Sequence, residues 1–389
     1  MRYMCTAGFL QNLTAKKKTD MFKPLFTLLL LAATGARAQP QRQPNIIVIV
    51  ADDLGWNDVG FHNPDIVSPH LNRLAQKGVE LTRFYVASLC SPTRAGLLTG
   101  RYPDRFGIRN GVIRPNMIGG LPLGEKTLAN VLAGAGYEKR AAFGKWHLGH
   151  SDVRYHPLQR GFTSFYGHYN GAIDYFTHYR DGALDWHRNY DVSRDTGYSV
   201  ELIGREVASF IHTAGEAPFF AYVAFNGVHS PLQAREQDLL KNGYDPRQSR
   251  NAKGPGGEYG KRGKGNSQRQ TFAAMVTGMD DAIGNILKAL DEKGISDNTL
   301  IWFLCDNGGT PRFGGNNSPL RGAKSTEWEG GVRSATLVYW KGHLEGGRKS
   351  AAVTGFIDVL PTLAGIAGVT RLPETDGRIV LEALRGGPA

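Results

Sequence analysis

The sequence predicts an α/β fold in which a large, mixed and mostly parallel β-sheet lies between layers of helices. Residues 45–51, 219–225 and 299–304 form continuous apolar runs, which are typical of strands buried on both faces. An amphipathic segment at 270–293 has the length and period of a helix that packs against such a sheet. Polar residues follow each of the three runs, at the edge of a parallel sheet where α/β proteins bind their ligands.

The remaining elements follow from apolar periodicity and from helix start and stop signals. We expect helices at 68–76, 91–99, 126–135, 200–211 and 358–367, and strands at 79–86, 141–143 and 335–340. Residues 151–200 are rich in aromatic side chains and histidine, and they form either the wall of a substrate pocket or an irregular aromatic core. Residues 245–269 are polar and rich in glycine and cations, which predicts a surface loop.

Composition sets few limits on function. The chain has 389 residues, enough for one large domain or two, and only three cysteines, at 5, 90 and 305. This number indicates no disulfide framework, and no zinc-binding spacing of cysteine and histidine occurs. The formal charge is +11, which favours anionic ligands in general but is equally typical of a mixed, solvated surface.

The N-terminal 38 residues have the character of a leader. A basic start at 21–23, an apolar run at 25–33 and the small-x-small sequence at 36–38 predict a signal peptide over 21–38, with residues 1–20 as an over-extended reading frame. The apolar run is too short to cross a bilayer. We therefore expect an exported protein without stable membrane insertion, with its folded domain at 39–389, in the periplasm or outside the cell, or in the lysosome of a eukaryote.

Acidic and amide side chains follow two of the buried strands directly. Asp52 and Asp53 come after 45–51, and Asp306 and Asn307 come after 299–304. An Asp-Asp pair in isolation is common in solvated turns, but adjacent carboxylates at a strand end repel each other unless a cation lies between them. Oxygen ligands without imidazole or thiolate favour Ca²⁺ or Mg²⁺ over zinc. The sequence thus predicts a metal site for a hard divalent cation.

The segment LCSPTRAGLLTGR at 89–101 predicts a nucleophile at the start of a helix. Ser91 is expected to cap the helix and Gly100 to end it. Cys90 would then lie where backbone N–H groups and the positive end of the helix dipole converge, which is an anion-binding arrangement. Arg94, one turn further along, is expected to face the same spot.

Five segments of this chain, in order, resemble motifs of the type I sulfatases. They are the strand-end Asp52-Asp53 pair, CSPTR at 90–94 followed by TG at 99–100, GKWHLG at 144–149, His229 with Pro231, and the group formed by DN at 306–307, GAK at 322–324 and EGGVR at 329–333. The resemblance implies an alkaline-phosphatase-like sandwich. Family members continue into a small antiparallel C-terminal subdomain, which we expect to be largely missing here.

The resemblance also implies roles for individual residues. Cys90 would be converted to formylglycine by the formylglycine-generating enzyme, and the hydrate of this group would be the nucleophile. The implied catalytic residues are Cys90, Arg94, Lys145, His147, His229 and Lys324. The implied ligands of a calcium ion, with magnesium as the alternative, are Asp52, Asp53, Cys90, Asp306 and Asn307.

The function implied by this resemblance is the hydrolysis of sulfate esters. Segments 52–62 and 171–176 are most similar to the arylsulfatase B (N-acetylgalactosamine-4-sulfatase) branch, which suggests a sulfated sugar or glycosaminoglycan-type substrate, or an aryl sulfate. Two alternatives remain: a phosphonate or phosphate ester hydrolase of the same superfamily, and an inactive, truncated glycan-binding relative. No nucleic-acid partner is expected.

Overall fold

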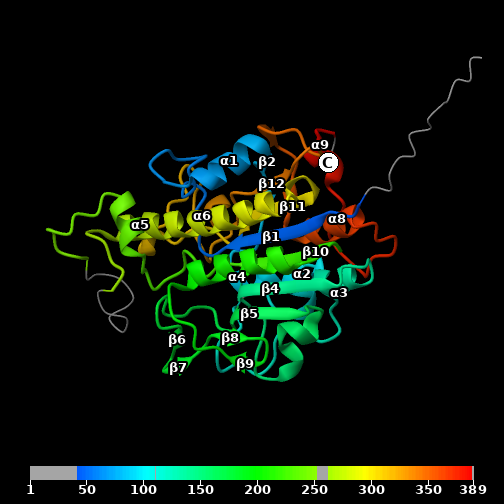
Figure 1. Cartoon of the computed structure of the whole chain (residues 1–389), viewed down its shortest axis with the longest axis horizontal. Coiled ribbons are helices and arrows are strands. Elements are labelled where there is room, and N and C mark those ends of the chain that lie inside the picture. The colour runs from blue at the N-terminus through cyan, green and yellow to red at the C-terminus, as the bar shows by residue number, and fades with distance from the viewer. Residues whose placement is uncertain (1–41, 110, 252–261, 388–389) are drawn as a thin grey trace, which may run out of the picture. The chain divides into compact units, whose positions relative to one another are not determined.

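The structure, a computed structural model, describes residues 42–109, 111–251 and 262–387 (Figure 1). The predicted leader at 1–38 and the centre of the polar loop, 252–261, lie outside the described residues. Within the described part of the chain, none of the helices combines the length and the apolar character needed to cross a membrane.

A ten-stranded sheet organises the described chain, with the strand order β13-β2-β12-β11-β1-β10-β4-β5-β8-β9. Its centre is parallel, which confirms the predicted α/β class, and consists of β11 (Thr299–Cys305), β1 (Asn45–Ala51), β10 (Phe219–Ala224), β4 (Lys139–Lys145) and β5 (Ser164–His168). Antiparallel pairs at β11–β12, β12–β2, β5–β8 and β8–β9 make the sheet mixed.

The outer strands are short. On one side of the centre they are β12 (Leu337–Trp340), β2 (Val79–Leu81) and β13 (Arg348–Ser350), and on the other side β8 (His187–Arg188) and β9 (Asp191–Val192). Two further two-stranded sheets pair β3 (Phe84–Tyr85) with β14 (Thr354–Gly355) and β6 (Tyr179–Arg180) with β7 (Ala183–Leu184).

Strand β1 is buried on both faces, as its apolar run predicts. Alternate residues enter two separate cores: Ile47 and Ile49 pack on one side of the sheet, and Ile46, Val48 and Val50 on the other. Helices α1 (Pro69–Lys77), α4 (Ser199–Thr213) and α6 (Gln268–Glu292) belong to the first core. Helices α2 (Cys90–Thr99), α3 (Leu128–Ala133), α8 (Val359–Ile366) and α9 (Leu381–Arg385) belong to the second. The short helices α5 (Glu236–Lys241) and α7 (Glu329–Val332) lie in connecting segments.

The structure corrects two local predictions and decides between the two alternatives of a third. The strand expected at 79–86 is divided into β2 and β3, which belong to different sheets. Ser91 does not cap α2, because its hydroxyl donates to the carbonyl of His147 and accepts from the amide of Ile113. Much of the aromatic segment 151–200 is core: Tyr166, Tyr175 and Trp186 are all buried.

Candidate active site

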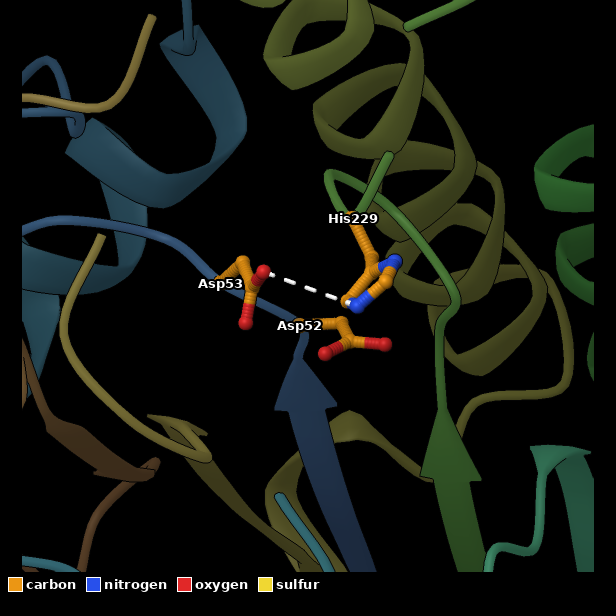
Figure 2. A group of neighbouring side chains, drawn as sticks. All are labelled: Asp52, Asp53 and His229. Carbon is orange, nitrogen blue, oxygen red and sulfur yellow. Dashed lines mark ion pairs between the residues drawn. The ribbon is translucent and has the colours of Figure 1, made fainter. Parts of the chain in front are cut away.

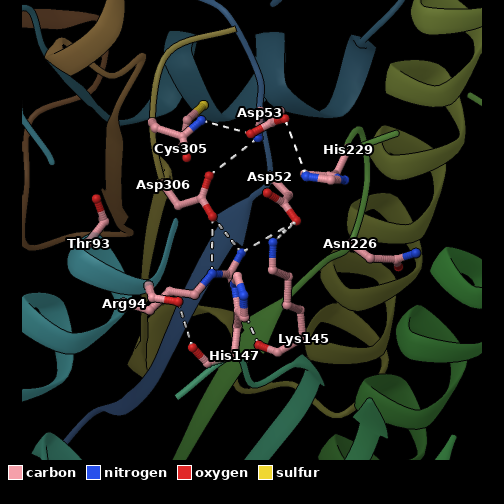
Figure 3. A network of polar contacts seen from close by, with 12 residues as sticks. Asp52, Asp53, Thr93, Arg94, Lys145, His147, Asn226, His229, Cys305 and Asp306 are labelled. Carbon is pink, nitrogen blue, oxygen red and sulfur yellow. Dashed lines mark hydrogen bonds and ion pairs between the residues drawn. The ribbon is translucent and has the colours of Figure 1, made fainter. Parts of the chain in front are cut away.

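The predicted polar residues meet at the carboxyl edge of the central strands (Figure 3). Backbone hydrogen bonds continue beyond the strands and hold the following loops together: Asp306 N donates to Ala51 O at 3.0 Å, and Val228 N donates to Asp52 O at 2.7 Å. Consequently the loops after β1, β10 and β11 form one cluster that contains Asp52, Asp53, Asp306 and His229. The residues of this cluster are up to 254 positions apart in the sequence.

Asp53 binds cationic and amide groups from two loops. Its carboxylate accepts from Lys324 Nζ at 2.5 Å and from Asn307 Nδ2 at 2.8 Å, and His229 Nε2 lies 3.7 Å away (Figure 2). Burial raises the pKa of Asp53, but Lys324, His229 and the Asn307 hydrogen bond outweigh it and hold the pKa well below its usual range. Asp53 is therefore ionised, and its φ of 59° marks a backbone that the surrounding contacts hold in an uncommon conformation.

Asp52 is completely buried and only half satisfied. Lys145 Nζ donates to Oδ2 at 2.6 Å, whereas Oδ1 has no hydrogen-bond partner among the described residues. Burial, followed by the nearby negative charge of Asp306, raises the pKa of Asp52 to about 7. A buried carboxylate oxygen without a partner is unfavourable, so this atom fits a site that takes up a further positive group.

Arg94 is hydrogen-bonded to a carboxylate of the cluster, Asp306. Its Nε and Nη2 donate to Asp306 Oδ2 at 3.0 and 2.7 Å, and its Nη1 donates to the carbonyl of Lys145 at 3.0 Å. The guanidinium is fully buried. Burial opposes its charge, but Asp306 and other neighbouring groups more than compensate and raise the pKa of Arg94 above its usual range. Arg94 is thus a buried counter-ion of Asp306, and Asp306 lies beside Cys90.

Cys90 is the first residue of α2, after Leu89 in an extended conformation. Its Sγ and carboxylate oxygens of Asp52 and Asp306 all lie within 4.8 Å of one another. Burial raises the pKa of the thiol to about 11, although Lys145 and Lys324 act in the opposite direction. A thiol with this pKa remains protonated at neutral pH and is a poor nucleophile.

The two predicted histidines carry neutral rings. Burial first, and then nearby cations, lower the pKa of His147 well below its usual range. Burial lowers the pKa of His229 to about 3, despite the opposite effect of Asp53. His229 Nδ1 contacts the carbonyl of Ser230 at 2.6 Å, which leaves Nε2 directed at the cluster, as Figure 2 shows. The buried Nδ1 of His147 has no partner among the described residues.

The donor set fits a hard divalent cation. Asp52, Asp53 and Asp306 provide carboxylate oxygens, and Asn307 Oδ1 is a buried amide oxygen that, like Asp52 Oδ1, has no partner in the described chain. Carboxylate and amide oxygens at this density are the ligands that Ca²⁺ and Mg²⁺ take. The four strand-end residues predicted as metal ligands are therefore brought together, with Cys90 beside them.

Sequence reasoning missed the residues that support this cluster from outside. Tyr175 belongs to the aromatic segment for which the sequence left a pocket wall and a core both open. Its hydroxyl donates towards the carbonyls of Asn226 (2.6 Å) and His229 (2.7 Å) and so fixes the loop after β10. Asp185, between β7 and β8, holds the turn after β5 through three hydrogen bonds, from Tyr169 N, Asn170 N and Asn170 Nδ2. Asp185 has no sequence signal, because it neither follows a buried strand nor belongs to a motif, and the resemblance of segment 171–176 gives Tyr175 no role.

Known proteins are similar to this chain in both sequence and fold. The sequence pattern of the Sulfatase family matches residues 44–369. Mouse arylsulfatase J is 36% identical over 336 residues, which cover 84% of this chain and 52% of that protein, and human arylsulfatase A is 36% identical over 376 residues, which cover 90% and 68%. The crystal structure of Ps i-CgsB in complex with k-i-k-neocarrahexaose superposes with a TM-score of 0.78 at 32% identity, over 88% of this chain and 76% of that one.

The chain spans about half to two thirds of the length of the curated relatives that it matches. The matched region contains every residue of the cluster, from Asp52 to Lys324. A family match over residues 44–369, together with relatives that share about a third of its residues over most of its length, shows that the chain belongs to the sulfatase family.

Proposed function

We propose that this chain hydrolyses sulfate esters, with a nucleophile made from Cys90 and a bound Ca²⁺ ion, or Mg²⁺ as the alternative. One observation carries the proposal: Cys90 lies at the start of α2, within 4.8 Å of two of the metal-site carboxylates, with Lys145 and Lys324 held on the same cluster. This arrangement combines a nucleophile, an anion-binding helix start and a set of cations, as sulfuryl transfer requires.

The thiol of Cys90 does not suit this reaction in its unmodified form, because its pKa of about 11 keeps it protonated. Conversion to formylglycine by the formylglycine-generating enzyme removes this difficulty. The hydrate of formylglycine supplies one hydroxyl that attacks sulfur and a second whose deprotonation releases the sulfate. The net reaction consumes one water molecule and yields an alcohol, sulfate and a proton.

The chain's own residues hold the ester and move the protons. Lys145 and Lys324 would bind the sulfuryl oxygens. These oxygens carry negative charge, and an ammonium group binds a charged oxygen more strongly than a neutral donor does. We assign to His229 the protonation of the departing alcohol and to His147 the removal of the proton that releases the sulfate. Both imidazoles are neutral without substrate, and a bound anion raises their pKa towards the range of acid–base catalysis.

The metal would be held by Asp52, Asp53, Asp306 and Asn307, with the modified residue 90 beside them. When bound, a divalent cation stabilises negative charge on the sulfuryl oxygens and lowers the pKa of a hydroxyl that it contacts. Arg94 orients Asp306 for this role through two hydrogen bonds to one carboxylate oxygen.

Removal of the metal should abolish turnover without unfolding the chain. After dialysis against a chelator, we expect hydrolysis of an aryl sulfate to be lost and to return with Ca²⁺ or Mg²⁺, whereas Zn²⁺ at equal concentration restores less, because three carboxylates and an amide oxygen suit a hard cation better than zinc. Circular dichroism before and after dialysis is the control. Full activity in the metal-free protein would contradict the assignment of these four residues.

A sulfated sugar is the substrate class that the comparisons support best. The two arylsulfatases and the structure solved with a carrageenan-type oligosaccharide are similar to this chain over most of its length. Export through the predicted signal peptide would bring the protein to extracellular or periplasmic glycans, or to the lysosome in a eukaryote. The formylglycine-generating enzyme would be a transient partner before export is complete.

A comparison of sulfate, phosphate and phosphonate esters of one alcohol tests the proposal. With 4-nitrophenyl esters, we expect kcat/KM for the sulfate to exceed the other two at least tenfold. The phosphate ester carries a second negative charge, and the phosphonate ester presents one oxygen fewer than the sulfate to the cations of the site. A preference for the phosphate or phosphonate would favour the superfamily alternative. Binding of sulfated oligosaccharides without any turnover would favour an inactive glycan-binding relative.

A further inference from the structure

We propose that Asp185 and Gly171 are positioning residues for His147: the Asp185 carboxylate holds the turn at 168–171, and this turn sets the backbone and the ring of His147. The assignment of a catalytic role to His147 rests on the proposed function. The placement of His147 by this turn is a separate, structural claim.

Asp185 is buried, and both of its carboxylate oxygens are used. Oδ1 accepts from Tyr169 N at 2.9 Å and lies 3.1 Å from His187 Nε2. Oδ2 accepts from Asn170 N at 2.9 Å and from Asn170 Nδ2 at 2.8 Å. Hydrogen bonds to a charged acceptor are stronger than neutral ones, and two consecutive backbone amides on one carboxylate define the orientation of the peptide between them.

The turn held by Asp185 reaches the end of β4 directly. Trp146 N donates to His168 O at 2.9 Å, and His147 N donates to Tyr169 O at 3.0 Å. The carbonyl of His147 accepts from the Ser91 hydroxyl at 2.9 Å, next to Cys90. His147 has a φ of 55°, a conformation that a non-glycine residue keeps only where its surroundings fix it. The Tyr169 carbonyl, placed by Asp185, is one of the groups that fix it.

Gly171 sets the imidazole itself. A Cβ atom at this position would lie 2.6 Å from both Cε1 and Nε2 of His147, so the ring packs against the glycine at a distance that no side chain would permit. Gly171 is not among the glycines with a left-handed φ. An alanine here is therefore compatible with the backbone, and its effect would fall on the His147 ring.

The first variant is Gly171→Ala, with Gly134→Ala as the matched control. Gly134 ends α3 with a φ of −68°, and an added Cβ would meet only Val131 O, at 3.4 Å. For Gly171→Ala we expect kcat for 4-nitrophenyl sulfate to fall about a hundredfold with KM within about threefold, because a displacement of about 1 Å at a catalytic group has an effect of that order. Because His147 is assigned to the sulfate-releasing step, the first turnover should release nitrophenol in a burst. The control, Gly134→Ala, should keep the wild-type kcat and KM and show no burst beyond that of the wild-type chain.

The second variant is Asp185→Asn, with Asp280→Asn as the matched control. Asp280 is another buried carboxylate that accepts two consecutive amides, from His70 at 2.9 Å and Leu71 at 2.7 Å, at the start of α1. Asparagine keeps the shape but replaces one acceptor by a donor. We expect both variants to lower the melting temperature, and only Asp185→Asn to lower kcat about tenfold and to speed hydrogen exchange of the His147 amide about tenfold.

These readouts separate positioning from general stability and from the proposed function. If Asp185→Asn and Gly171→Ala changed only the melting temperature, with kcat, burst and His147 exchange as in the controls, the positioning claim would be wrong. If the wild-type protein hydrolysed no ester, the proposed function would fail. Amide exchange at His147 in Asp185→Asn, and the ring's place in a crystal structure of Gly171→Ala, would still decide the positioning claim.

Discussion

Replacement of Cys90 by alanine is expected to lower turnover of sulfate esters by about four orders of magnitude or more, the scale seen when a nucleophile is removed from an otherwise intact site. The fold should remain, because Cys90 is a small buried residue and α2 begins without a side-chain cap, so that no helix or strand of the described chain is held by the thiol. Rates with an aryl sulfate and circular dichroism of both proteins measure the two effects.

Cys305→Ala is the matched control. Cys305 is the other buried cysteine of the described chain, and its Sγ lies 3.9 Å from the carbonyl of Ala335, in the core of the sheet. We expect the control to keep the wild-type kcat and to lose at most about 1–2 kcal/mol of unfolding free energy. Substantial turnover by Cys90→Ala would show that the nucleophile lies elsewhere.

Asp306→Ala is expected to affect both stability and activity. The Arg94 guanidinium would lose two hydrogen bonds to Asp306 Oδ2 and keep the one to the carbonyl of Lys145, with Asp52 Oδ2 as a more distant carboxylate at 3.8 Å. A buried charge that loses its partner destabilises a protein by about 3–5 kcal/mol. Turnover should fall to background as well, because the metal site loses a carboxylate. Urea unfolding and an aryl sulfate assay measure these effects.

The double variant Asp306→Ala/Arg94→Met separates the two effects. Replacement of both charged partners by apolar residues is often neutral or stabilising, so we expect most of the lost stability to return. Activity should not return, because the carboxylate is still absent. An active double variant, or a single variant as stable as the wild type, would contradict the account of Arg94 and Asp306.

The sequence predicted best those features that depend on residues adjacent in the chain, namely the central strands and the residues at their ends. The runs at 45–51 and 299–304 correspond to β1 and β11 almost residue for residue, because a strand buried on both faces has to be continuously apolar. The position of Asp52, Asp53, Asp306 and Asn307 at one edge also followed, since parallel strands end on the same side of a sheet.

What the sequence could not predict depends on contacts between distant segments. The partner of Arg94, Asp306, lies 212 residues away in the sequence, and only the packing of α2 on the sheet shows that the two residues meet. Serine commonly caps helices, yet the hydroxyl of Ser91 donates to the carbonyl of His147 and accepts from the amide of Ile113. The contacts of Asp185 with the turn after β5 belong to the same class.

The mass of the peptide that spans Cys90 tests the central claim most directly. The protein should be produced together with a formylglycine-generating enzyme, and in parallel without one. We predict that the first preparation shows the mass loss of thiol-to-aldehyde conversion and hydrolyses sulfate esters in proportion to the converted fraction. An unmodified thiol in protein made with that enzyme, or equal turnover by both preparations, would contradict a mechanism built on a modified Cys90.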